Sequence, residues 1–208
     1  EERVCNSAER ICTQCSLPLN TVWICSQCDH ITVPARSDFF TLFGLKPQFD
    51  LEHSALTDKM NALQSIVTSK KENKPNEEKF DQFAEQMQAA FNTLESPLNR
   101  AKYLLDLNGK GQEVYTPDPL FFSHIANLQI ELDNETVPKS NLLKLMKDAC
   151  GATLVYRNKL ATEFKKEKWD ANELGDLIGK LDWTFRVIQQ ISELLPDESD
   201  PESPKPKE

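Results

Sequence analysis

The sequence has few glycines, no long apolar run and no surplus of positive charge, and each shortage excludes a class of protein. Six glycines among 208 residues are too few for a collagen-like chain. No apolar stretch approaches the roughly 20 residues that a helix needs to cross a bilayer, so we expect no transmembrane segment. The 33 acidic residues outnumber the 24 basic ones, which gives a net charge of −9. Because a phosphate backbone is bound by clustered positive charge, this balance indicates protein partners rather than nucleic acid.

The sequence also lacks the motifs that enzymes most often use. It has no glycine-rich phosphate-binding loop and no Gly-x-Ser-x-Gly nucleophile elbow. Its histidines, His30, His53 and His124, stand apart with no nucleophile pattern around them. Acidic pairs such as Glu163 and Glu167 lie one helical turn apart and are better explained as a solvated helix face. We therefore predict that the protein is not an enzyme.

Four of the six cysteines lie close together near the beginning of the chain. Cys12 and Cys15 form one Cys-x2-Cys knuckle, and Cys25 and Cys28 form a second after nine intervening residues. Each knuckle places two thiolates on one side of a tight turn, and two knuckles complete the closed four-sulfur site that is typical of structural zinc. The alternative is a pair of disulfides in an exported protein, although no secretory signal precedes the knuckles. We predict one structural zinc ion at these four cysteines.

From residue 38 onward the apolar residues recur at the period of an α-helix. One stripe ends at Val67, before a polar break over residues 68–76 that we expect to form a loop. Pro75 within it would end any helix still running. A second stripe follows, and the two helices should pack antiparallel. A short third helix has Ser96 as its N-cap, Pro97 at its first position and Asn108-Gly109 at its end. The first two stripes are Leu56, Met60, Leu63 and Val67, and Phe80, Phe83, Met87, Phe91 and Leu94.

The second half of the chain predicts three more helices, enough to close one bundle core. Thr116-Pro117-Asp118-Pro119 opens the first of them, and Cys150 falls within the second, where we expect it in the core. From Pro196 the chain has four prolines and alternating charges without an aliphatic residue, which predicts a disordered tail. The last two apolar stripes are Leu142, Met146, Ala149, Thr153, Tyr156, Leu160 and Phe164, and Leu174, Leu177, Ile178, Leu181, Phe185, Ile188, Ile191 and Leu195.

Short motifs between residues 38 and 132 carry a resemblance to a known family. They include Asp38-Phe39-Phe40-Thr41-Leu42-Phe43-Gly44-Leu45 and the run Ser96-Pro97-Leu98-Asn99-Arg100-Ala101-Lys102-Tyr103-Leu104-Leu105. The second run is the more specific, because ordinary J-domains lack it. These motifs resemble the HscB/Jac family, the J-domain co-chaperones of iron–sulfur cluster biogenesis. The double-knuckle segment is similar to the zinc-binding extension of the family's animal-type members.

The resemblance implies a domain order and a location. The fold class would be mainly α, with a zinc-knuckle module at 1–36, a J-like domain with a helical hairpin at 37–109 and a three-helix bundle at 110–195. An acidic, proline-rich tail would occupy 196–208. Family membership also implies the mitochondrial matrix, with a presequence removed.

The family's chaperone-contacting motif is missing from this sequence. Family members carry His-Pro-Asp in the loop between the two long J-domain helices, where it engages a heat-shock chaperone and triggers ATP hydrolysis. The corresponding positions here are Thr68, Ser69 and Lys70, and no His-Pro pair occurs anywhere in the chain. The basic face that accompanies the motif is reduced to Lys59 and the Lys70-Lys71 pair. The resemblance therefore implies a J-like domain without its ATPase-stimulating motif.

The family's scaffold-binding site is also altered. It lies on the first helix of the bundle and combines exposed apolar residues with carboxylates that bind the cluster scaffold protein. The apolar part is present here, but the carboxylates expected at His124 and Asn127 are absent. We predict that partner contacts involve Phe121, Phe122, Ile125 and Asn127.

Two main hypotheses about function follow. The one we favour on the sequence alone is a non-catalytic scaffold or accessory subunit of a larger mitochondrial complex, such as one of the respiratory chain. The alternative is a divergent iron–sulfur assembly co-chaperone that still binds the cluster scaffold or the mitochondrial heat-shock chaperone. A zinc-ribbon nucleic-acid binder ranks third, because the sequence has no dense cluster of lysine and arginine.

Overall fold

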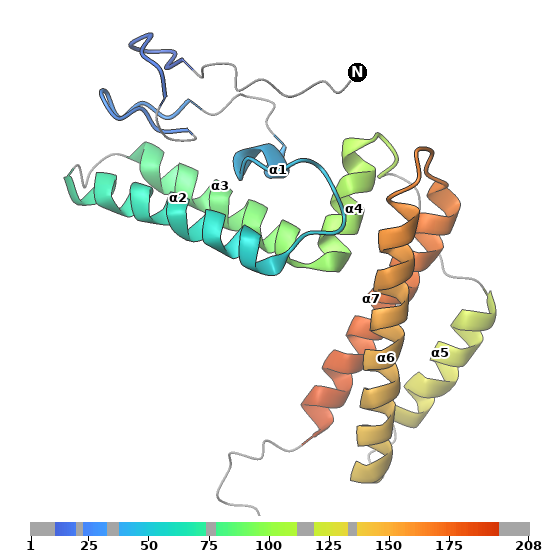
Figure 1. Ribbon diagram of the computed structural model, residues 1–208. Coiled ribbons are helices and arrows are strands. Elements are labelled where there is room, and N and C mark those ends of the chain that lie inside the picture. Colours follow the sequence, from blue (N-terminus) through green and yellow to red (C-terminus); the bar gives the residue numbers. More distant parts are fainter. Residues whose placement is uncertain are drawn as a thin grey trace, which may run out of the picture. The chain divides into compact units, whose positions relative to one another are not determined.

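The chain folds into helices that divide between two compact units. The computed structural model describes residues 11–19, 23–32, 38–73, 78–111, 119–132 and 137–195. These residues are mainly helical (Figure 1), which confirms the predicted fold class. One unit spans Glu1–Asn108 and the other Gly109–Glu208. None of the described helices is long and apolar enough to cross a membrane. The predicted tail lies outside the described residues.

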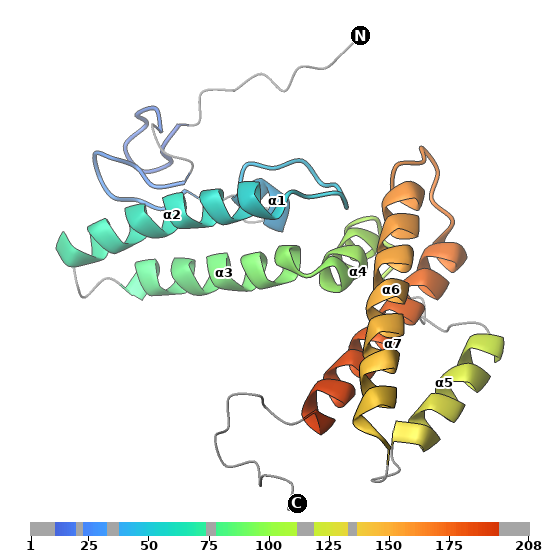
Figure 2. The ribbon, with the colours of Figure 1, turned by 60° about the horizontal axis from the view of Figure 1, so that its bottom comes forward.

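The first unit contains a short helix, a long helical hairpin and a short closing helix. These are α1 (Phe39–Leu42), α2 (His53–Asn73), α3 (Glu78–Glu95) and α4 (Pro97–Leu107). The Asp38 carboxylate caps α1 by accepting a hydrogen bond from the Thr41 N–H at 2.8 Å. Helices α2 and α3 lie antiparallel (Figure 2), and their predicted apolar stripes are buried, except for Phe91, which is half-buried.

Helix α2 is longer than the sequence predicts, and this corrects the expected loop at residues 68–76. The helix continues to Asn73, so that Thr68, Ser69 and Lys70 are helical rather than part of a loop. No glycine or proline occurs between Thr68 and Asn73, and polar residues alone do not end a helix. Lys70 and Lys71 also lie in the last turn, where positive charge interacts favourably with the helix dipole and stabilises the helix. The predicted Pro75 break lies outside the described residues.

Helix α4 begins and ends where the sequence predicts. The Ser96 hydroxyl accepts a hydrogen bond from the Asn99 N–H at 3.3 Å, and Gly109 adopts a φ of 70° just after the Asn108 cap. Two side chains from the run that carries the family resemblance, Arg100 and Tyr103, have structural roles in this helix. The Arg100 guanidinium is buried and donates to the Leu94 carbonyl at 2.5 Å. The Tyr103 hydroxyl accepts from the Phe39 N–H at 2.9 Å.

The second unit is the predicted bundle of three helices, α5 (Pro119–Leu132), α6 (Lys139–Glu163) and α7 (Ala171–Leu194). The Asp170 carboxylate caps α7 through the N–H groups of Asn172 and Glu173. Cys150 is exposed on α6, which corrects its predicted place in the core. Its neighbour Ala149 faces the core instead. The core cluster is formed by Ile125, Leu132, Leu142, Ala149, Val187 and Ile191.

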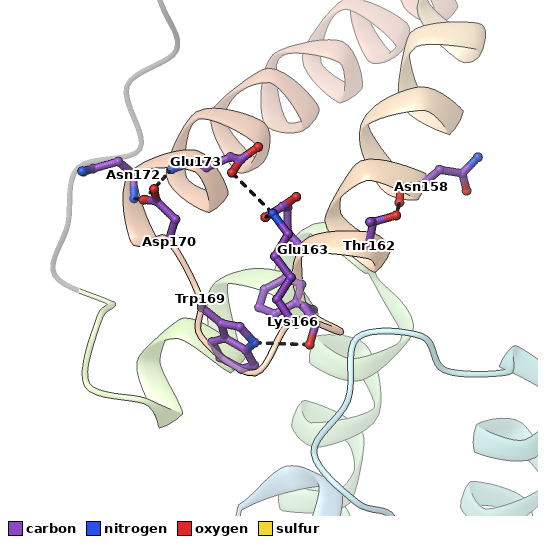
Figure 3. A network of polar contacts seen from close by, with 9 residues as sticks. Asn158, Thr162, Glu163, Lys166, Trp169, Asp170, Asn172 and Glu173 are labelled. Carbon is purple, nitrogen blue, oxygen red and sulfur yellow. Dashed lines mark hydrogen bonds and ion pairs between the residues drawn. The ribbon is translucent and has the colours of Figure 1, made fainter.

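A polar and aromatic network fixes the turn between α6 and α7 (Figure 3). The Lys166 ammonium pairs with the buried Glu163 carboxylate and lies 3.9 Å from that of Glu173. The hydrogen bond that the Lys166 ammonium donates to the Glu163 carboxylate raises the pKa of Lys166. The Trp169 indole N–H donates to the Phe164 carbonyl at 3.2 Å, and the two rings meet edge to face. These contacts hold the start of α7 against the end of α6.

Candidate metal centre and partner surfaces

The two cysteine knuckles have the same backbone geometry. In each, the residue after the second cysteine adopts a positive φ, 58° at Ser16 and 57° at Asp29. The N–H of that residue donates to the carbonyl of the first cysteine, Ser16 to Cys12 at 2.9 Å and Asp29 to Cys25 at 3.0 Å. Two isolated antiparallel bridges close the turns, Ile11 with Pro18 and Ile24 with Ile31.

The four cysteine sulfurs face one another at distances that suit one metal ion. The Cys12 and Cys28 sulfurs lie 3.6 Å apart, as do those of Cys15 and Cys25. All four sulfurs are within 4.8 Å of one another. A tetrahedral site with metal–sulfur bonds of about 2.3 Å has sulfur–sulfur edges of about 3.8 Å. The donor set and its spacing therefore fit a closed four-sulfur metal site.

Backbone dipoles prepare the first cysteine of each knuckle for a cation. Burial works to raise the pKa of Cys12, but the N–H groups of Cys15 and Gln14 point at its sulfur and lower that pKa to about 6. The N–H groups of Cys28 and Gln27 lower the pKa of Cys25 in the same way. Because the thiolate is the metal-binding form, both turns favour the charge state that a metal needs.

The second knuckle docks on the helices of the first unit. The Trp23 indole N–H donates to the Leu42 carbonyl at 2.7 Å, at the end of α1. The Lys70 ammonium lies 2.6 Å from the Asp29 carboxylate, which joins the last turns of α2 to the knuckle. Thr68 and Ser69 beside it are exposed. No spacing in the sequence predicts these contacts, because Asp29 and Lys70 are far apart along the chain.

The residues predicted to bind a partner on α5 do not share one environment. Ile125 is only 5% exposed and packs in the core, which corrects its predicted place on the partner surface. Phe121 is half-buried, with its ring edge to face with Tyr156. Asn127 is exposed. The side chain of Phe122 lies outside the described part of the structure. A partner role for Asn127 stays a prediction.

A partly open apolar cavity of about 190 Å³ lies between the three helices of the second unit. The sequence does not predict it, because each helix has an ordinary apolar stripe. Asp148 and Thr184 supply its polar edge. The apolar lining includes Phe121, Ile125, Leu128, Ala149, Tyr156 and Val187.

Sequence comparisons relate this chain to bacterial co-chaperones over most of its length. No family model matches the chain. The co-chaperone protein HscB homolog of Vibrio vulnificus (strain CMCP6) is 30% identical over 165 residues, which are 73% of this chain and 93% of the relative. The HscB homolog of Vibrio cholerae (serotype O1, strain M66-2) is 28% identical over 166 residues, 74% of this chain and 94% of the relative.

Solved structures agree with the sequence comparisons. The chaperone HscB from Vibrio cholerae matches with a TM-score of 0.64 at 28% identity, covering 76% of this chain and 96% of that one. The human co-chaperone protein HscB matches with a TM-score of 0.74 at 19% identity, covering 88% of this chain and 98% of the human chain. The helical hairpin and three-helix unit thus define a J-domain-like co-chaperone fold. With a 30% identical relative covered almost completely, the chain belongs to the HscB co-chaperone family.

Proposed function

We propose that this protein is a divergent HscB-type co-chaperone of iron–sulfur cluster assembly. The observation that carries the proposal is the match at 30% identity across 93% of a co-chaperone relative. A match of this extent includes residues of both compact units rather than a single shared helix pair. The comparisons support this alternative better than the accessory-subunit hypothesis that the sequence alone favours, because the two Vibrio relatives and the two structural neighbours are co-chaperones or chaperones.

The proposed role is non-catalytic and rests on two surfaces. We propose that the second unit binds the cluster scaffold protein through the exposed side of α5, where Asn127 lies. The first unit supplies the J-like hairpin, but the positions of the family's tripeptide are helical and carry Thr68, Ser69 and Lys70. We therefore propose that the chain binds partners without stimulating a chaperone ATPase through this site.

We further propose that the four cysteines hold zinc and that the protein works in the mitochondrial matrix. Zinc is supported by the closed four-sulfur arrangement of Cys12, Cys15, Cys25 and Cys28. When bound, it would crosslink the two knuckles and supply no reactive position. The matrix location is supported by the resemblance to animal-type family members, and fractionation of organelles tests it directly.

Calorimetric titration of the purified chain with the iron–sulfur scaffold protein of the same organism tests the proposed function. We expect saturable binding, which Asn127→Glu strengthens about fivefold (about 1 kcal/mol) by returning one carboxylate to the helix. Asn158→Glu is the matched control, because Asn158 is an exposed asparagine on α6 and should leave the affinity unchanged. The absence of binding by wild type and Asn127→Glu alike would overturn the proposal.

A further inference from the structure

The end of α2 is already occupied by another part of the same chain. We infer that the C-terminal turns of α2 are the docking site of the chain's own second knuckle, so that metal binding at the cysteines strengthens this contact. The partner that this helix end fits is therefore internal: the second knuckle, which presents the Asp29 carboxylate to Lys70 of α2, while the Trp23 indole just before it contacts the end of α1. The inference needs metal binding by the cysteines but does not depend on the co-chaperone role.

The first contact is an ion pair whose acidic member is positioned by the knuckle itself. Asp29 directly follows Cys28, and its backbone is fixed at a φ of 57° with its N–H bonded to the Cys25 carbonyl. Its side chain is 17% exposed and that of Lys70 is 28% exposed, with 2.6 Å between charged atoms. A partly buried pair is screened by salt much less than an exposed one. The position of this carboxylate thus depends on the turn that the metal would hold.

The second contact is made by a residue that precedes the same knuckle in the chain. Trp23 precedes Cys25 by two residues and is only 3% exposed. Its indole N–H donates to the Leu42 carbonyl at 2.7 Å, and its own carbonyl accepts from the Thr32 N–H at 2.8 Å. The knuckle is therefore attached at two points, one at the end of α1 and one near the end of α2.

Attachment at two points links metal affinity to docking. A metal fixes the turn that carries Asp29, and a fixed turn keeps the carboxylate beside Lys70 without further loss of conformational freedom. By thermodynamic linkage, the factor by which a bound metal strengthens docking equals the factor by which docking strengthens metal binding. Lys70 is thus a positioning residue for the metal centre, although it is not one of the metal ligands.

The neighbouring lysine provides a control within the same helical turn. Lys71 pairs with Asp81 at the start of α3 and so joins the two helices of the hairpin. Its exposure, 39% of the side chain, is similar to that of Lys70. Two adjacent lysines therefore make ion pairs with different parts of the unit, and only one of these pairs reaches the knuckle.

A double-mutant cycle on the full-length chain tests the inference. Zinc affinity is measured by competition with a chromophoric chelator for wild type, Lys70→Ala, Asp29→Asn and the double variant. Asparagine tolerates the positive φ at this position. We expect Lys70→Ala to lower the affinity about fivefold in the wild-type background, and to change it little when Asp29→Asn is already present. Lys71→Ala should leave the affinity unchanged.

Three outcomes of these measurements would overturn the inference. One is an equal effect of Lys70→Ala in both backgrounds, which would mean that the lysine acts by its charge at a distance. Another is an equal loss of affinity in Lys71→Ala. The third is failure to bind zinc at all. None of these outcomes bears on scaffold binding, so a failure here is distinguishable from a failure of the proposed function.

Hydrogen exchange provides a readout that does not use substitutions. Removing zinc from the wild-type chain with a chelator should speed amide exchange over residues 66–71 of α2. Exchange in the middle of α3, over residues 84–90, should stay the same. Unchanged exchange at 66–71 after complete zinc removal would contradict the inference.

Discussion

The sulfur atoms of the metal centre are prepared by backbone groups rather than by neighbouring charged side chains. Each second cysteine accepts an N–H from the residue two positions later, Leu17 for Cys15 and His30 for Cys28. Burial and the nearby thiols outweigh this donor and raise the pKa of Cys15 to about 12. Without a metal, protons are therefore retained on Cys15 and Cys28, and a bound cation takes their place.

Substitution of one ligand should empty the centre without unfolding the helices. We expect Cys12→Ser to lose about one metal ion per chain, because a closed structural site needs all four thiolates. The helical circular-dichroism signal should stay largely intact, since no helix contains a knuckle. Metal content is measured by elemental analysis of the purified protein. Cys150→Ser is the control, because this thiol is exposed on α6. A Cys12→Ser variant that keeps its metal would refute the four-cysteine site.

Tyr103 gives the first unit a predictable response to alkaline pH. Burial raises its pKa above the ordinary 10.0, so the unfolded chain loses this proton first as the pH rises. The stability that the tyrosine contributes is complete below pH 10 and is lost as the pH rises through the folded-state pKa. Urea unfolding between pH 8 and 11 should show a steeper loss for wild type than for Tyr103→Phe. Equal pH dependence in the two proteins would contradict this assignment.

At the scale of helices, local signals predict boundaries well and longer-range contacts poorly. The start of α4 at Ser96-Pro97 and its end at Asn108-Gly109 follow from cap chemistry within a few residues. The continuation of α2 through residues 68–73 could not be predicted in this way, because polar residues without glycine or proline are compatible with either a loop or a helix. Its contact with the knuckle, from Lys70 to Asp29, has no local signature at all.

Whether a helical residue is buried or exposed can also change from one position to the next. Ala149 is buried while the next residue, Cys150, is exposed, because successive residues on a helix are about 100° apart. The sequence correctly indicates an apolar stripe on α6, but it does not show whether the cysteine next to Ala149 belongs to that stripe. On α5 the same ambiguity led to a predicted surface that included Ile125, which the structure buries.

Rebuilding the family's tripeptide in α2 should fail for a structural reason. In the variant Thr68→His, Ser69→Pro, Lys70→Asp, the proline removes a helical N–H and clashes with the preceding turn, at a cost of about 3 kcal/mol. The new aspartate also places a second carboxylate beside Asp29. We expect lower stability in urea and no stimulation of a mitochondrial heat-shock chaperone ATPase.

Thr68→His alone is the control for this variant, because Thr68 is exposed and the change should affect stability by less than about 0.5 kcal/mol. Strong ATPase stimulation by the triple variant, with its stability unchanged, would show that α2 accepts the tripeptide and that its helical end is not the obstacle.

Over the whole molecule, the family match extends across most of the chain but not all of it. The bacterial relatives align with 73% to 74% of this chain but are themselves covered almost completely. The human co-chaperone structure extends the match to 88% of this chain, as a likeness of fold. About a quarter of the chain therefore lies outside the alignments with the two bacterial relatives.

We propose that the chain works with the iron–sulfur assembly proteins rather than as a fixed part of a larger complex. Native size fractionation of gently solubilised mitochondria, with detection of this chain and its companions, distinguishes these two roles. We expect a small species that co-purifies with the cluster scaffold protein or the heat-shock chaperone. Comigration with a large complex at fixed stoichiometry, without either protein, would contradict it and make the chain a structural subunit.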